Sequence, residues 1–339
     1  MMSSNIPSAE ALRGDLIEKP VASREGAEPL VSVVTVCFNP LKEGRQKTFA
    51  MNLDSVQAQT GVALEHLIID GASADGTLDF LKSYDNRRHD IRILSKADTG
   101  IYEAMNRGIA LARGRYVIFL NSDDYYYRQD GLALSVKALE ESGCSFTFAP
   151  IRPDGSRFRH RLHRHPQRHL HRVFLFCTIP HPSMLFLRSA LLEADGYDCS
   201  YRLAADYDMM LRLIAVGHKV CFVDKPFVMF SSGGFSGRNR TLNMQEKALI
   251  VRNFHEKVFG IELSDAETDT LVRRCRYPRR LLSVYVASQR MIDQTFVGVP
   301  RSLGQKLLHG FNFWKYYLKC LLGAERKSKG FAMLLANPL

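Results

Sequence analysis

Apolar runs alternate with stretches of helical spacing through the first half of this chain. Four of the runs are rich in β-branched and aromatic residues, which is typical of strands buried on both faces. They are Val31–Cys37, Leu64–Ile69, Ile91–Leu94 and Tyr116–Leu120. Helical spacing covers 43–58, 101–113 and 132–141, Gly114 stands at the C′ position expected after a helix, and a short apolar run covers 145–149. This alternation predicts a parallel, doubly wound α/β sheet.

Polar side chains follow each of the four predicted strands. Asn39 follows the first strand, Asp70 the second, Asp98 the third, and Asp123 with Asp124 the fourth. Because the carboxyl ends of parallel strands lie at one edge of a sheet, we expect these side chains around a single crevice. A helix cap would explain one of them. Two adjacent carboxylates after a buried strand are costly without a cation or hydrogen-bond donors, so the recurrence on four strands predicts a binding site.

The missing motifs narrow what this crevice binds. No Gly-x-Gly-x-x-Gly follows the first strand, and no Gly-x-x-x-x-Gly-Lys-Ser/Thr occurs in the chain. Clustered carboxylates repel a diphosphate, but they can bind Mg²⁺ or Mn²⁺, which in turn binds phosphate oxygens. The remaining acidic residues suit the hydroxyls of a ribose and the N–H edge of a base.

Four ordered motifs at these strand ends resemble those of the family 2 glycosyltransferases, over about Val31 to Gly237. The motifs are Phe38-Asn39, Asp70-Gly71-x-Ser73-x-Asp75-Gly76-Thr77, Asp98-x-Gly100-Ile101-Tyr102-x-Ala104-x-Asn106 and Asn121-Ser122-Asp123-Asp124. The resemblance implies a GT-A fold and a nucleotide-diphospho-sugar donor. We therefore expect a Rossmann-like, mostly parallel sheet flanked by helices, with a helical C-terminal extension.

The same resemblance implies roles for individual residues on the donor side. Asp70 would contact the base and Asp123 the ribose, while Asp124 would bind the Mg²⁺ or Mn²⁺ that holds the diphosphate. Nucleotide contacts are also expected from three further residues at the strand ends, namely Phe38, Asn39 and Asp98. Asn121 stands where many relatives have Asp, which leaves the choice of metal ligand open.

The acceptor side is expected further along the chain. His181, in a His-Pro-Ser segment, resembles the part of the family that enters the site from this half, and a packed core histidine is the alternative. Asp206, at the start of a helix, resembles the family's catalytic base, although Ala205 replaces the Glu found before the base in many relatives; a capping role is the alternative. We place Arg212 on the same side. Residues 230–236 resemble the mobile loop that closes the catalytic half of the fold.

Composition divides the chain further. We expect a flexible leader over 1–29, a catalytic domain over 30–240 with a nucleotide-binding half (30–125) and an acceptor half (126–240), and a helical, basic region over 241–339. The formal charge is +11, and a net charge of +8 lies between Pro278 and the last residue. The aromatic and basic stretch 311–319, with Trp314, is typical of an interfacial helix, and a helix packed on the catalytic domain is the alternative.

Three further features bear on location and metal content. Six Arg and five His lie between Arg157 and Arg172, and a basic loop beside the donor or a lipid phosphate is favoured over a zinc site, because no Cys or carboxylate completes a recognised pattern. Seven scattered cysteines without a Cys-x-x-Cys indicate reduced thiols and a cytoplasmic location. No signal peptide and no apolar run of about 20 residues is present.

These observations favour an inverting, metal-dependent glycosyltransferase. It would move a sugar to the hydroxyl of a saccharide or a lipid-linked acceptor in polysaccharide or glycolipid assembly, and its basic tail would allow contact with the anionic cytoplasmic face of a membrane. A glycosidase with a carboxylate pair is one alternative, but it needs neither a metal nor a base-binding acid. A basic nucleic-acid-binding protein is the other, and no recognised nucleic-acid motif supports it.

Overall fold

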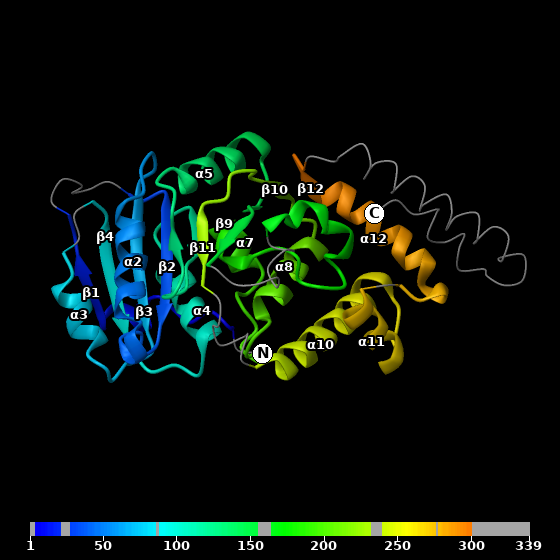
Figure 1. Ribbon diagram of the computed structural model, residues 1–339, viewed down its shortest axis with the longest axis horizontal. Helices are drawn as coiled ribbons and strands as arrows, with labels where there is room; N and C mark the ends of the chain where they lie inside the picture. The colour runs from blue at the N-terminus through cyan, green and yellow to red at the C-terminus, as the bar shows by residue number, and fades with distance from the viewer. Residues whose placement is uncertain are drawn as a thin grey trace, which may run out of the picture.

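The protein is described here by a computed structural model that covers residues 4–21, 28–85, 88–154, 164–231, 239–275 and 277–299 (Figure 1). Within these residues, nine strands form one sheet in the order β1-β4-β3-β2-β5-β9-β7-β10-β12. They are β1 (Leu16–Lys19), β2 (Val31–Cys37), β3 (Leu64–Asp70), β4 (Asp90–Ser95), β5 (Tyr116–Phe119), β7 (Phe146–Phe148), β9 (Leu185–Leu187), β10 (Val220–Phe222) and β12 (Phe296–Val297).

The four predicted strands form the parallel centre of this sheet. β2 pairs in parallel with β3 and β5, and β3 pairs in parallel with β4. The register joins Val31 to Leu64 at one end and Cys37 to Asp70 at the other, so the carboxyl ends are level. The predicted α/β fold with a mostly parallel sheet is therefore confirmed. Two strands are exceptions: β9 runs antiparallel to both β5 and β7, and the edge strand β1 runs antiparallel to β4.

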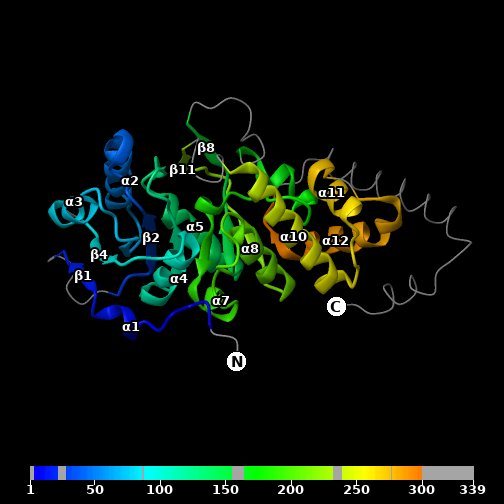
Figure 2. The same ribbon diagram turned by 90° about the horizontal axis from the view of Figure 1, so that it is seen from below.

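Helices cover both faces of the sheet, as a doubly wound fold requires. Figure 2 shows α2 and α3 on one side of β2 and β4, and α1 and α4 on the other. Successive residues of β2 point into different cores: Val33 packs in the core that includes α5, and Val34 in the core that includes α4 and α8. The bounds are α1 (Glu10–Arg13), α2 (Gln46–Gln57), α3 (Thr77–Ser83), α4 (Ile101–Leu111), α5 (Gly131–Ser142), α7 (Arg188–Glu193) and α8 (Ala205–Ala215).

A small second sheet and a group of C-terminal helices complete the described residues. β6 (Tyr125–Tyr126), β11 (Val228–Phe230) and β8 (Ile151–Pro153) form the three-stranded sheet. The helices α10 (Arg240–Phe259), α11 (Asp265–Arg274) and α12 (Leu282–Thr295) lie together at the right of Figure 1 and confirm a helical C-terminal extension over this part. The aromatic stretch 311–319 lies outside the described residues.

Two expectations at the ends of elements are wrong. Residues 4–21 were expected within a flexible leader, but they form α1 and the edge strand β1, which pairs antiparallel with β4 from Leu16↔Leu94 to Lys19↔Ile91. Gly114 is not a helix cap, because α4 already ends at Leu111. A Cβ on Gly114 would lie 2.5 Å from the backbone N of Ser32, so glycine is needed for close packing on β2.

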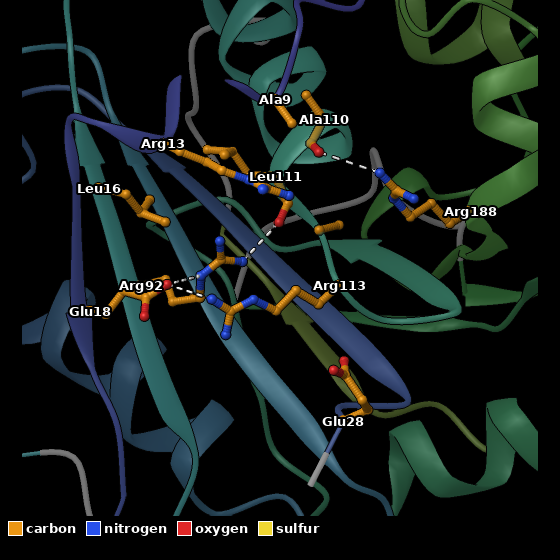
Figure 3. Close-up of a pocket in the computed structure, with 11 residues that line it drawn as sticks. Ala9, Arg13, Leu16, Glu18, Glu28, Arg92, Ala110, Leu111, Arg113 and Arg188 are labelled. Atoms are coloured by element: carbon orange, nitrogen blue, oxygen red, sulfur yellow. Dashed lines mark hydrogen bonds and ion pairs between the residues drawn. The ribbon is translucent and has the colours of Figure 1, made fainter. Parts of the chain in front are cut away.

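Arginines hold the carboxyl end of α4 against the sheet. A cavity of about 590 Å³ lies there, lined by residues of β1, β4, α4 and α7 (Figure 3). Arg92 donates to Glu65 (2.9 Å) and to the carbonyl of Leu111 (2.8 Å), and Arg188 donates to the carbonyls of Ile109 (3.1 Å) and Ala110 (3.3 Å). The guanidinium groups thus bind helix carbonyls that lack a partner within the helix.

The buried pair between Arg92 and Glu65 gives a test of this packing. Their side chains are 4% and 2% exposed, so Arg92→Ala leaves a carboxylate and a carbonyl buried without this donor and should lower the free energy of unfolding by about 3–5 kcal/mol. Lys96→Ala is the control, because the Lys96–Asp15 pair is 45% and 53% exposed and should contribute about 0–1 kcal/mol. Urea unfolding followed by circular dichroism measures both. Equal losses for the two variants would contradict this account.

Candidate active site

The ends of the parallel strands bring an exposed aromatic ring next to an acidic side chain. Phe38 follows β2 and is 65% exposed. A Cβ on Gly71 would lie 2.9 Å from Asp98 Oδ2 and 3.3 Å from the Phe38 ring, so the three residues are neighbours. Burial raises the pKa of Asp98, and Arg107 opposes the shift. An exposed ring beside a half-buried carboxyl group provides a flat apolar surface and a hydrogen-bonding group for a planar ligand.

Asp70 and Asn39 connect the loops rather than point outward. Asp70 is fully buried; it accepts from the backbone N of Ser73 (3.0 Å), from the Ser95 hydroxyl (2.6 Å) and from the Ser73 hydroxyl. Asn39 adopts a positive φ of 48° and donates its backbone N–H to the Ser73 hydroxyl (2.7 Å). Its side-chain oxygen accepts from the backbone N of Ala74 (3.0 Å). Both residues therefore fix the 70–74 loop beside Phe38.

One buried side-chain amide on α2 holds the loop after β5. Asn52 on α2 is fully buried and donates to the carbonyls of Asn121 (2.9 Å) and Asp124 (2.8 Å). The backbone N of Asp124 donates to the carbonyl of Asn121 (3.0 Å), which closes a tight turn. Ser231, after β11, donates its backbone N–H to Asp124 Oδ1 (2.8 Å) and its hydroxyl to the carbonyl of Asp123. The turn is thus fixed by α2 on one side and by the end of β11 on the other.

Two oxygens of this turn are buried without a hydrogen-bond partner. They are Asp124 Oδ2 and Asn121 Oδ1. Burial, and next the charge of Asp123, raise the pKa of Asp124 well above its usual value. Burial also raises the pKa of Asp123; Arg45 opposes that shift and Asp154 adds to it. These two oxygens lack hydrogen-bond partners, and the ionised form of the carboxylate is disfavoured. A divalent cation would provide the missing interaction and would stabilise the ionised form.

The protein by itself provides only part of a metal-ligand set. Within the described ranges, no three His, Cys, Asp or Glu side chains are placed to hold a metal ion by themselves. Mg²⁺ and Mn²⁺ often take only one or two carboxylates and fill the other positions with water and substrate phosphates. The side chains of Asp124 and Asn121 fit this kind of shared site.

Asp206 lies at the same edge, in the first turn of α8. The Tyr102 hydroxyl, on the first turn of α4, donates to Asp206 Oδ1 at 3.4 Å, and the backbone N of Tyr207 donates to it at 2.8 Å. Because α4 begins at Ile101, three residues after Asp98, this contact joins Asp206 to the loop at the end of β4. Asp206 is partly exposed, as a group that meets a substrate must be.

His181 is buried beside this carboxylate. Its ring stacks on Phe119, with centroids 5.6 Å apart, and its Nε2 lies 2.8 Å from the Tyr197 hydroxyl. Burial lowers the pKa of His181, and the charge of Asp206 opposes that shift. His181 is therefore a packed core residue whose pKa also depends on the charge of Asp206. Its contact with a substrate stays a prediction.

Arg212 uses its donors inside the protein. It donates to Asp208 (2.7 Å), to the carbonyl of Gly196 (2.7 Å) and to the carbonyl of Ala194. These contacts tie α8 to the turn at 194–196, where Asp195 and Gly196 have positive φ. They give no support to a substrate contact by Arg212.

Several residues of the site were not found from the sequence. Asn52 and Arg45 occur in and before a helix without a motif, and Asp154 follows the short strand β8. These residues lie far in the chain from the strand ends that they affect. Each acts through a contact that exists only in the folded chain, so no local sequence pattern marks them. Of the predicted loop 230–236, only the first two residues are described, and of the Arg/His-rich stretch only 164–172.

Comparison with known proteins identifies the chain. The family model for glycosyl transferase family 2 matches residues 32–194. An uncharacterized glycosyltransferase of Mycobacterium tuberculosis is 34% identical over 191 residues, which cover 56% of this chain and 70% of that protein. The chain belongs to glycosyltransferase family 2. The PGL/p-HBAD biosynthesis glycosyltransferase of the same species is 30% identical over 162 residues, or 47% of this chain and 62% of that one.

Solved structures agree on the GT-A fold of this family 2 member. The mannosyltransferase PcManGT from Pyrobaculum calidifontis, in complex with GDP-Man and Mn²⁺, gives a TM-score of 0.53 at 15% identity, covering 96% of this chain and 88% of that one. TarS of S. aureus, in complex with UDP-GlcNAc, gives 0.51 at 14% identity, covering 78% and 89%. Membership of this family makes the chain a glycosyltransferase, rather than the glycosidase or nucleic-acid-binding protein that the sequence analysis considered. Across the described ranges, no helix has the length and apolar content to span a bilayer.

The amide of Asn52 gives a test of the turn at 121–124. Asn52→Ala leaves two carbonyls without this donor in a buried place, so it should lower the free energy of unfolding by about 1–3 kcal/mol. It should also weaken Mn²⁺ binding, because Asp124 Oδ2 is then held less firmly. Gln46→Ala, at an exposed position of the same helix, should change neither quantity. Urea unfolding and calorimetry with Mn²⁺ and UDP would measure both. An Asn52→Ala variant with unchanged cation affinity would contradict this role.

Proposed function

We propose that this family 2 glycosyltransferase is an inverting, metal-dependent enzyme that moves a sugar from a nucleotide diphosphate to an acceptor hydroxyl. The observation that supports the proposal best is the position of Asp206. It is a partly exposed carboxylate, bonded to Tyr102 at the sheet edge where Asp98, Asp123 and Asp124 also lie. One carboxylate on the acceptor side and several on the donor side suit a single displacement.

The donor would bind across the ends of β2 to β5. Phe38 would stack on the base, since its ring is exposed and lies beside Asp98. Asp98 and Asp123 would bind hydroxyls or N–H groups of the nucleoside, and Asn39 would shape the loop beside them. Asp70 would act on the base mainly by ordering the 70–74 loop, because its oxygens already accept protein hydrogen bonds.

Asp124 and Asn121 would hold the divalent cation, since each has a buried oxygen without a hydrogen-bond partner in the same turn. The cation, when bound, offsets the negative charge that builds on the leaving diphosphate. The PcManGT complex contains Mn²⁺, and this chain would accept Mn²⁺ or Mg²⁺. Ser231 and Asn52 would keep the two ligands in place through the bonds described above.

Asp206 would be the general base. It takes the proton from the acceptor hydroxyl while that oxygen forms a bond to the anomeric carbon and the bond to the diphosphate oxygen breaks. The proton remains on Asp206, and the electron pair of the broken bond leaves with the nucleoside diphosphate. Attack from the face opposite the leaving group inverts the anomeric configuration.

The acceptor is proposed to be a saccharide or a lipid-linked intermediate of envelope glycolipid or polysaccharide assembly. The curated relative whose name includes PGL/p-HBAD biosynthesis supports a glycolipid. The net charge of +8 after Pro278 supports contact with an anionic cytoplasmic membrane face, where each basic residue contributes about 1 kcal/mol. Most of that stretch lies outside the described residues, so the proposal rests on its sequence.

Loss of the base should be visible in transfer and not in donor binding. Asp206→Asn keeps the size of the side chain but cannot take the proton, so transfer should fall by about 10²–10⁴-fold. Donor affinity should stay close to that of the wild type, because Asp206 lies on the acceptor side. Calorimetry with UDP- and GDP-sugars plus Mn²⁺ selects the donor, and release of nucleoside diphosphate with octyl glycosides as acceptors measures transfer.

Asp208→Asn is the matched control for this base. Asp208 lies two residues after Asp206 in α8 and accepts a hydrogen bond from Arg212. Loss of its carboxylate should therefore reduce transfer much less. Transfer by Asp206→Asn at nearly the wild-type rate would show that the base is elsewhere.

Metal dependence has a separate test. Activity should disappear in EDTA and return with Mn²⁺ or Mg²⁺, and Asp124→Asn should weaken cation and nucleotide binding together, because the two ligands share one site. Calorimetry of Mn²⁺ with and without UDP or GDP measures this coupling. Full activity in excess chelator would remove the cation from the mechanism.

A further inference from the structure

The helix that carries Asp206 has no cap of its own. Ala204 is the N-cap residue of α8, and no side chain of the cap accepts a hydrogen bond from the first turn. Helix N-termini leave backbone N–H groups unpaired, and these usually bind a side-chain oxygen close by in sequence. Ala204 and Ala205 have no such oxygen. Asp206 Oδ1 meets the backbone N of Tyr207, and the backbone N of the N-cap residue Ala204 is met by another helix.

Glu246 of α10 holds the N-cap residue of α8 and the two residues before it. Its Oε1 accepts from the backbone N of Arg202 at 2.8 Å, and its Oε2 accepts from Leu203 at 2.9 Å and from Ala204 at 3.0 Å. The residue is only 9% exposed. A buried carboxylate is costly unless donors meet it, and here three backbone donors meet both oxygens. The negative charge also lies where the positive end of the α8 dipole favours it.

The three residues whose backbone N–H groups bind Glu246 stand shortly before the proposed base in the chain. Asp206 follows Ala204 by two positions, in the first turn of α8. Its other support is the Tyr102 hydroxyl from α4. Burial, and next the charge of Asp206, raise the pKa of Tyr102, and the charge of Glu246 adds a smaller contribution. Both carboxylates therefore lie near one tyrosine, in a cluster built from α4, α8 and α10.

We propose that Glu246 is a positioning residue for the catalytic base, and that the C-terminal helical region thereby forms part of the active site. The inference rests on the proposed role of Asp206. Glu246 does not contact the substrate; it holds residues 202–204, which lead into the first turn of α8, and so it fixes the place from which the Asp206 carboxylate extends. A base that is misplaced by about 1 Å can lose about 10²-fold in rate, so a remote cap can matter for chemistry.

The experiment compares two changes at Glu246 in the full chain. Glu246→Ala removes the acceptors and should lower kcat for transfer by about 100-fold while the donor KM stays within about twofold. Glu246→Gln keeps one acceptor oxygen and should restore part of that loss, so that its kcat is about tenfold below that of the wild type. The control is Glu256→Ala, an exposed glutamate on the same helix, which should leave kcat unchanged. Release of UDP or GDP from the donor chosen by calorimetry, with octyl glycosides as acceptors, gives kcat and KM.

Each outcome decides between this role and a purely structural one. Wild-type kcat in Glu246→Ala, even with a lower melting temperature, would overturn the inference and leave the role of Asp206 intact. If Glu246→Ala does not fold, Glu246→Gln decides: a reduced kcat with unchanged donor KM supports positioning, and an unchanged kcat overturns it. A wild-type chain that releases no nucleoside diphosphate with any donor would overturn the proposed function itself, and the inference with it.

Discussion

The parallel pairing of β2 with β3 and β5 is the constraint on which the site depends. Parallel strands in level register place their carboxyl ends at one edge, so the residues that follow each strand must share one space. The loops in that space then bind each other: Asn39 to Ser73, Asp70 to Ser95, and Asn52 to the turn at 121–124. The sheet sets the positions, and these hydrogen bonds set the orientations.

Charge follows the same geometry. The donor side gathers carboxylates whose ionised forms are disfavoured, as the raised pKa values of Asp98, Asp123 and Asp124 show. In the proposed mechanism a divalent cation would offset this negative charge, and the diphosphate of the donor would bind to that cation. Cation and donor would then support each other's binding, and the hydrogen bonds of Asn52 and Ser231 would keep the turn at 121–124 in place for both.

Much of the fold could be predicted from the sequence, and less of the site. The strand over Val31–Cys37 matches its predicted bounds because both faces are buried and mostly apolar and the turn after it is abrupt. The antiparallel β9 could not be found, since a three-residue strand has too little pattern to show direction. Asn52 and Glu246 were missed for a related reason: each acts on a distant loop, and a contact between segments far apart leaves no local spacing. Arg212 was expected on the acceptor side, yet the fold uses it to tie α8 to a turn.

The edge strand β1 has a consequence for how the protein can be handled. It covers the outer side of β4, whose backbone groups would otherwise form an open ladder on the parallel half of the sheet. Exposed ladders of this kind recruit strands from other molecules. Removing the first twenty or so residues would thus expose the backbone edge of β4 through the loss of four backbone pairs, and we expect self-association through that edge.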